Sequence, residues 1–291
     1  MQPKYYQPSE ELNSLNLVNG LLILLAITMI IGYIYSLLIF VIPLVYLNFV
    51  IAVGLGVALS YCIRFIIRWV KIRDDRSRQI LVVFGILFVS FFQWTAFVDS
   101  VLLERFPTPI EYIQSFQWIF APQEYLLFIG EIYKYGTWGM ILSNFQFNGI
   151  LLLAVWLVEL IVIASPSIKL ISNYDIFPFS EKLNKWYPKY TLIKDFKAMA
   201  SKNSIEEKLD SGVMEALNNL EEGSAVYHTR IQLFYLEGEE NHYLNVNKVK
   251  IERGSNDESV TPLIKNYRID SATANDIRRQ FKMEKERFDI F

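Results

Sequence analysis

The stretch that decides the fold reads LVNGLLILLAITMIIGYIYSLLIFVIPLVYLNFVIAVGLGVALSYCIRFIIRWV, from Leu17 to Val70. Its only charged residues are Arg64 and Arg68, close to its end. A helix needs about 20 apolar residues to cross a bilayer, so this run is long enough for two crossings. Proline disfavours helix at the residue before it, and Pro43 therefore marks the turn between them. The sequence predicts an integral membrane protein.

The rest of the chain extends this pattern to a four-span bundle. We expect a polar N-terminus at residues 1–16 and a transmembrane domain at residues 17–165. Its spanning helices are predicted at residues 17–40, 47–70, 80–98 and 149–164, the last ended by Pro166.

Residues 100–148, between the third and fourth spans, are rich in aromatic side chains. Tyr and Trp at this density suit the headgroup region of a membrane. We predict two short interfacial helices here, at residues 110–120 and 123–135, which form an aromatic belt. A lid over a cavity is the alternative.

The distribution of basic residues predicts the orientation. Lys71, Arg73, Arg76 and Arg78 lie in the loop between the second and third spans, whereas residues 100–148 contain only Arg105 and Lys134. Loops rich in Lys and Arg stay on the cytoplasmic side. With four spans, we expect both termini to be cytoplasmic, in a bacterial inner (plasma) membrane.

Residues 166–291 have the composition of a soluble domain. They contain 19 Lys and Arg and 20 Asp and Glu, which is dense but nearly neutral charge and argues against binding to nucleic acid. We predict a cytosolic α+β domain in which residues 177–196 are irregular. Its predicted elements are a helix at 194–220, a hairpin of strands at 224–236 and 242–253, a third strand at 263–269, and a helix at 272–286 with Ser271 as its N-cap.

Two charged residues within the predicted spans are candidates for function. Glu159 and Arg64 lie at similar predicted depths on parallel spans, so they can form an ion pair. Such a pair is either a structural link or, in a functional interpretation, part of a gate or a proton relay. Arg64 can also extend to lipid phosphate instead.

Other features of the spans point to packing between helices. Gln93 and Thr95 either line a path or form hydrogen bonds between helices. Ala52, Gly56 and Ser60 recur at every fourth residue, and small residues at this spacing let another helix approach closely, within the chain or in a second copy.

The sequence contains no recognisable catalytic, cofactor or metal motif. Cys62 is the only cysteine, and His228 and His242 are the only histidines, which is too few ligands for a thiolate zinc site. We expect both histidines to be exposed to solvent, with a metal site between them as the alternative.

These observations favour a non-enzymatic anchor, sensor or adaptor whose cytosolic domain binds a protein or a ligand. The alternative is an oligomeric channel or transporter component with a polar path through Arg64, Gln93 and Glu159. The expected partners are membrane lipid and either further copies of the chain or a membrane or cytosolic protein.

Overall fold

A computed structural model describes residues 3–9, 13–42, 44–136, 138–139, 146–172, 177–198, 201–224, 226–251 and 258–286. The chain divides into two compact units, one formed by residues 9–172 and the other by residues 3–8 together with residues 177–286. Each unit has a hydrophobic core of its own.

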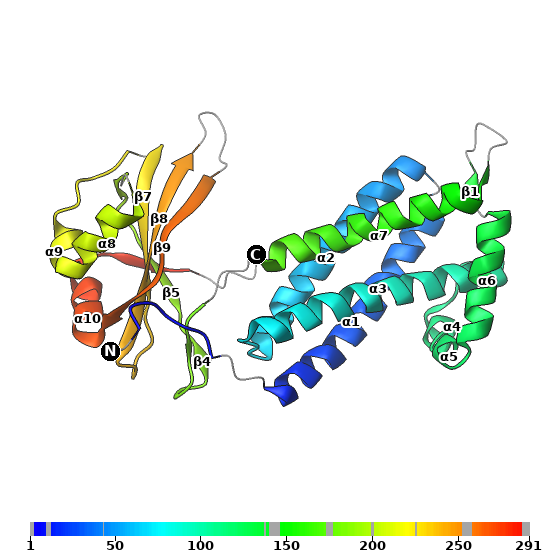
Figure 1. Ribbon diagram of the computed structural model, residues 1–291, viewed down its shortest axis with the longest axis horizontal. Helices are drawn as coiled ribbons and strands as arrows, with labels where there is room; N and C mark the ends of the chain where they lie inside the picture. The colour runs from blue at the N-terminus through cyan, green and yellow to red at the C-terminus, as the bar shows by residue number, and fades with distance from the viewer. Residues whose placement is uncertain are drawn as a thin grey trace. The chain divides into compact units, whose positions relative to one another are not determined.

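The first unit contains four helices that are long and apolar enough to cross a membrane: α1 (Ser14–Val41), α2 (Val45–Trp69), α3 (Asp75–Leu102) and α7 (Gly149–Ser172). α1 packs on α3 and α2, while α7 packs chiefly on α2 (Figure 1). Leu24, Leu59 and Ile163 are fully buried among them. Large apolar side chains such as Ile150 and Ile161 are exposed, as lipid-facing residues of a membrane protein are.

Several helix ends differ from the prediction, and α3 continues past residue 98 to Leu102. Pro166 does not end the fourth span, because α7 continues to Ser172 with the proline inside it. The hydroxyl of Ser165 donates to the carbonyl oxygen of Ile161 (2.6 Å) in the turn beside the proline. α3 begins at Asp75 instead of residue 80 because the carboxylate of Asp74 caps it by accepting a hydrogen bond from the backbone nitrogen of Ser77 (2.6 Å).

The described residues of the aromatic segment between α3 and α7 form three helices instead of two, grouped at one end of the bundle (Figure 1). α4 (Pro109–Gln114) begins with a capping box between Thr108 and Glu111. α5 (Gln117–Phe120) and α6 (Pro122–Tyr135) follow, and a pair of two-residue strands, β1 (Trp138–Gly139) and β2 (Gln146–Phe147), leads to α7.

The second unit is an antiparallel sheet with the strand order β10-β5-β7-β8-β9, in which β6 also pairs with β7. Its strands are β5 (Lys189–Leu192), β6 (Phe196–Lys197), β7 (Tyr227–Phe234), β8 (Asn241–Ile251), β9 (Glu258–Asp270) and β10 (Met283–Lys285). A separate short hairpin joins β3 (Phe179–Ser180) to β4 (Lys185–Trp186).

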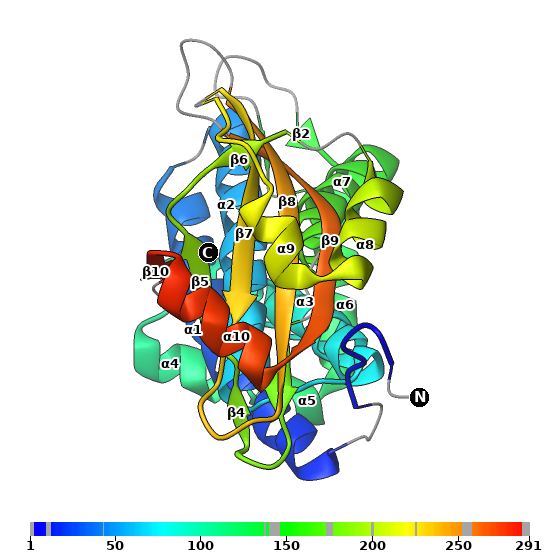
Figure 2. The same ribbon diagram turned by 90° about the vertical axis from the view of Figure 1, so that its left-hand side faces the viewer.

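Three helices cover one face of this sheet: α8 (Lys202–Ser211), α9 (Val213–Asn218) and α10 (Ser271–Gln280), as Figure 2 shows. Ile231 and Leu233 of β7 pack under them with Leu244 of β8, because alternate residues of a strand face the same side. Residues 4–6, the N-terminal strand, pair with the outer edge of β9. This pairing joins the first residues of the chain to its C-terminal domain.

The α+β prediction is confirmed at the level of helices with a C-terminal sheet, but several elements differ. The predicted helix at 194–220 is β6 followed by α8 and α9, which are separated at Gly212. Residues 177–196 contain β3, β4 and β5. Asp270, not Ser271, caps α10, and that helix ends at Gln280.

Candidate functional site

Glu159 lies near the middle of α7, ten residues after Gly149, and not near the end of a span. The hydroxyl of Tyr35 on α1 donates a hydrogen bond to its carboxylate (2.5 Å). Tyr35 is itself buried. The partner that the structure shows for Glu159 is therefore a phenol on the first helix, and its pairing with Arg64, which is half-buried on α2, stays a prediction.

The other predicted polar residues of the bundle lie on α3. Gln93 is buried, and its main-chain carbonyl accepts a hydrogen bond from the hydroxyl of Ser36 on α1 (2.9 Å). Thr95 is also buried, and its hydroxyl donates to the carbonyl of Phe92 in its own helix (2.9 Å). Tyr35 and Ser36 are adjacent in sequence, so one turn of α1 contacts both Glu159 and the main chain at Gln93.

The small residues of α2 face α7 within the same chain. A Cβ atom added at Gly56 would lie 2.5 Å from the carbonyl oxygen of Ile163 and 3.0 Å from Cγ of Pro166. The hydroxyl of Ser167 donates to the carbonyl of Gly56 (3.3 Å). Ala52 and Ser60 are buried one turn to either side. Gly56 thus permits a contact between main chains that a larger residue would prevent.

A buried polar contact near the end of α3 was not expected from the sequence. Asp99 is 9% exposed, and its carboxylate accepts hydrogen bonds from the indole nitrogen of Trp118 (3.0 Å) and from the hydroxyl of Ser115. This contact joins α3 to the aromatic segment. Tyr112 of α4 joins the same segment to α1 through its hydroxyl, which donates to the carbonyl of Met29 (2.9 Å).

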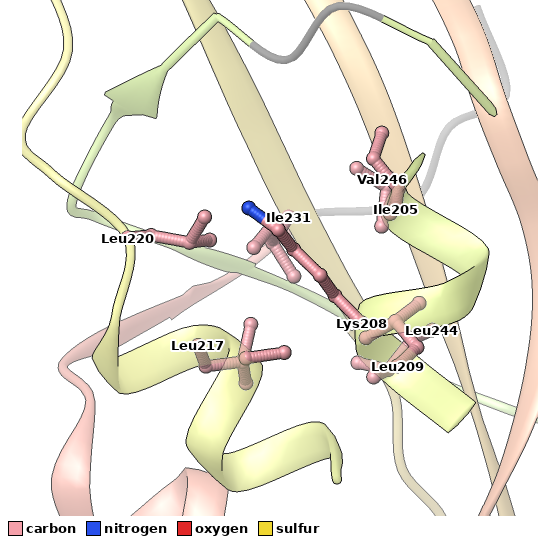
Figure 3. A pocket seen from close by; sticks show the side chains of 9 residues that line it. Ile205, Lys208, Leu209, Leu217, Leu220, Ile231, Leu244 and Val246 are labelled. Carbon is pink, nitrogen blue, oxygen red and sulfur yellow. The ribbon is translucent and has the colours of Figure 1, made fainter. Parts of the chain in front are cut away.

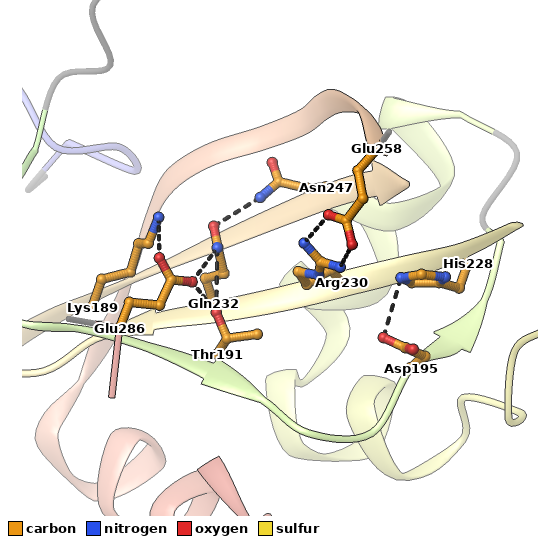
Figure 4. A network of polar contacts seen from close by, with 9 residues as sticks. All are labelled: Lys189, Thr191, Asp195, His228, Arg230, Gln232, Asn247, Glu258 and Glu286. Carbon is orange, nitrogen blue, oxygen red and sulfur yellow. Dashed lines mark hydrogen bonds and ion pairs between the residues drawn. The ribbon is translucent and has the colours of Figure 1, made fainter. Parts of the chain in front are cut away.

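In the C-terminal domain, the face of the sheet opposite α8–α10 carries a network of polar side chains, which we call the polar sheet face (Figure 4). Alternate residues of β7 supply its centre, and neighbouring strands supply their partners. The residues that form the polar sheet face are Lys189, Thr191, Asp195, His228, Arg230, Gln232, Asn247, Glu258 and Glu286.

A chain of hydrogen bonds crosses this face. The amide nitrogen of Asn247 donates to the amide oxygen of Gln232 (2.8 Å), and the amide nitrogen of Gln232 donates to the carboxylate of Glu286 (2.7 Å). Lys189 forms an ion pair with the same carboxylate (2.5 Å). Gln232 and Asn247 are buried, so the network satisfies their amides.

One charged pair on the polar sheet face is more exposed than the two amides. Both terminal nitrogens of Arg230 donate to the carboxylate of Glu258, at 2.8 and 2.9 Å. This two-point contact lowers the pKa of Glu258 and keeps the carboxylate ionised. Donors and acceptors in a fixed array of this kind suit recognition of a polar surface.

Both histidines are buried, so the expectation of exposed side chains was wrong. His228 is 1% exposed and lies 3.2 Å from Asp195, while β7 places it opposite Val249 of β8. His242 is also 1% exposed and stacks on Tyr235 at 4.5 Å between ring centroids. The two rings sit on different parts of the hairpin and do not share a site.

His242 has the hydrogen bonds of a structural residue. The backbone nitrogen of Leu236 donates to its Nδ1 (3.4 Å), so Nε2 carries the proton and donates to the hydroxyl of Ser271 (3.1 Å). That hydroxyl in turn donates to the carbonyl of Glu239 (2.7 Å). A nucleophile–base pair needs an acceptor nitrogen facing the hydroxyl, and this tautomer presents a donor.

A small hollow lies between α8, α9 and the sheet, with the side chain of Lys208 extending over it (Figure 3). Its other lining side chains are all apolar, which gives a ligand nothing to orient it. They are Ile205, Leu209, Ala216, Leu217, Leu220, Ile231, Leu244 and Val246.

Within the described parts of the chain, no group of three or more His, Cys, Asp or Glu side chains is arranged to hold a metal ion. Comparison with protein-family models, with curated proteins and with solved structures finds no match in any of the three.

Proposed function

We propose that this chain is a non-enzymatic four-span membrane protein whose C-terminal domain recognises a protein or a ligand on the polar sheet face. The observation that carries the proposal is the position of this network. It lies on the side of the sheet opposite the helices, and it includes the more exposed charged pair of Arg230 and Glu258. The bundle then anchors the recognition domain or transmits its occupancy.

The N-terminal strand supports the arrangement of the spans. The eight residue-to-residue steps from Tyr6 to Ser14 reach at most about 28 Å, which is less than the roughly 30 Å of a hydrocarbon core. Since residues 4–6 belong to the C-terminal domain, this short reach supports a start of α1 on the same side of the membrane as that domain. It thereby supports an even number of spans, and the basic loop around Lys71 supports a cytoplasmic position for this side.

A charge reversal on the polar sheet face tests the proposal. We would capture tagged Arg230→Glu from native membranes in mild detergent and quantify the proteins that accompany it by mass spectrometry. The matched control is Arg279→Glu on α10, whose exposed side chain lies 3.9 Å from Asp276. A stoichiometric partner of the wild type should be lost from Arg230→Glu and retained by Arg279→Glu. Equal retention by both variants would refute recognition at this face.

A second candidate function is that of an oligomeric channel or transporter component. The contact between Tyr35 and Glu159 favours it, because it places an ionisable group and its partner inside the bundle. If the chain is a conduit, Glu159→Gln, Arg64→Gln or Gln93→Leu alone should change ion flux in reconstituted vesicles. Unchanged flux in all three variants would exclude this candidate.

A further inference from the structure

The N-terminal strand occupies an edge of the sheet in the manner of a bound peptide. The backbone nitrogen of Arg268 donates to the carbonyl of Lys4 (2.9 Å), and that of Tyr6 donates to the carbonyl of Asn266 (2.9 Å). Tyr5 forms an antiparallel bridge with Tyr267 between these two bonds. An extended peptide that adds a strand to an exposed sheet edge makes the same main-chain contacts.

The side chain of Lys4 is held by two acids of α8. Its ammonium group lies 2.7 Å from the carboxylate of Glu206 and 2.7 Å from that of Asp210. These acids are four residues apart, so they face the same side of the helix. Their hydrogen bonds with Lys4 lower the pKa of both carboxyl groups, which therefore stay ionised. The carboxylates of Glu206 and Asp210 together form a binding site for one cation.

The two residues after Lys4 are held by contacts between aromatic rings. The ring of Tyr5 packs edge-on against Tyr267 (6.0 Å between centroids), and its hydroxyl donates to Glu206 (2.7 Å). Tyr6 packs edge-on against Tyr243 (5.2 Å). The edge therefore contacts three consecutive features: a cation, an aromatic ring with a hydroxyl, and a second aromatic ring.

We propose that this edge of β9 is a binding site for an extended basic–aromatic–aromatic segment of a partner protein, and that the N-terminal strand is its resident, displaceable occupant. Two features make displacement feasible. The strand is only three residues long, and the side chains of its ion pairs are 24–49% exposed, so solvent screens them. The proposal concerns the edge of the sheet and is independent of the polar sheet face.

A synthetic peptide tests the proposal directly. The probe is a fluorescent peptide of residues 1–9, MQPKYYQPS, titrated into the detergent-solubilised chain that lacks residues 1–8. We expect saturable binding, and binding at least about tenfold weaker to the full chain, whose tethered strand competes at high effective concentration. A peptide with Lys4→Glu should also bind at least about tenfold more weakly.

Charge variants supply the controls. Glu206→Lys combined with Asp210→Lys should abolish binding of the wild-type peptide and favour the Lys4→Glu peptide, whereas Glu207→Lys, on an exposed neighbouring position, should change nothing. If the shortened chain does not fold, the full chain with Lys4→Glu replaces it in the titration, because this substitution should release the chain's own N-terminal strand from the edge. Absence of binding to a folded variant, or equal affinity for the shortened and full chains, would overturn the proposal.

Discussion

Substitution of Gly56 by alanine tests the packing of the bundle at its closest contact. The added Cβ atom would lie 2.5 Å from the carbonyl oxygen of Ile163, and real Cβ atoms do not approach this closely. The obstacle is main chain inside a helix, so α2 and α7 must move apart. Overpacking of this kind costs about 1–3 kcal/mol of the free energy of unfolding. The hydrogen bond from Ser167 to Gly56 would lengthen and add roughly 0.6 kcal/mol.

The matched control is two residues away on the same helix. A Cβ atom at Gly54 would meet nothing within 4 Å. Gly54→Ala should therefore keep the stability of the wild type or raise it by about 0.5–1 kcal/mol, because alanine loses less backbone entropy in a helix.

Equilibrium unfolding in mixed micelles of dodecyl maltoside and SDS, followed by circular dichroism, measures both variants. Gly56→Ala should unfold at a lower fraction of SDS than the wild type, and Gly54→Ala at the same fraction or a higher one. If the two variants unfold together, the close approach of α2 to α7 is incorrect. The small-residue face of α2 would then be free to pack against a second copy.

Three further predictions concern other contacts. Tyr35→Phe removes the donor to Glu159 and should cost about 1–3 kcal/mol of the free energy of unfolding in mixed micelles, more than Glu159→Gln, which keeps an acceptor. Burial lowers the pKa of His242, so below about pH 6.5 the unfolded state binds a proton that the folded state does not. The free energy of unfolding, measured by urea titration, should therefore fall as the pH drops below about 6.5. It should fall less steeply in His242→Gln. Gly223→Ala brings a Cβ atom 2.4 Å from a carbonyl oxygen of β6 and should lower the melting temperature of the C-terminal domain by several degrees. Gly130→Ala, whose Cβ atom would meet nothing within 4 Å, should leave that melting temperature unchanged.

The sequence was sufficient to locate the four long apolar helices because hydropathy is a local property of about twenty consecutive residues. It could not place the end of α7. Pro166 lacks a backbone N–H, and a proline usually interrupts a helix for this reason. Here its ring packs against Gly56 of α2, where an added Cβ atom would lie 3.0 Å from Cγ of Pro166. The packing that tolerates this proline depends on residues about 110 positions away, and no local pattern reveals it.

The prediction of the C-terminal sheet from the sequence was limited in the same way. The hairpin of β7 and β8 was predictable because apolar residues alternate along both strands, although in β8 the alternation slips by one position between Val246 and Val249. β5, β6 and β10 are two to four residues long, too short for alternation to be visible. The N-terminal strand was also missed, because a strand of three residues is stabilised by the β9 edge and by α8, not by its own sequence.

The contact between Glu159 and Tyr35 shows why a carboxylate within a membrane is hard to assign from sequence. A search for its partner looks for a cation, since opposite charges offset the loss of hydration. A phenol meets part of the same need by donating one hydrogen bond, but in a sequence it is indistinguishable from the aromatic residues that only pack. α2 and α7 run in the same direction, and Gly56 lies against Ile163, so Ala52, one turn earlier, is level with Glu159. The small-residue face of α2 and the half-buried carboxylate of Glu159 therefore lie at the same level of the bundle.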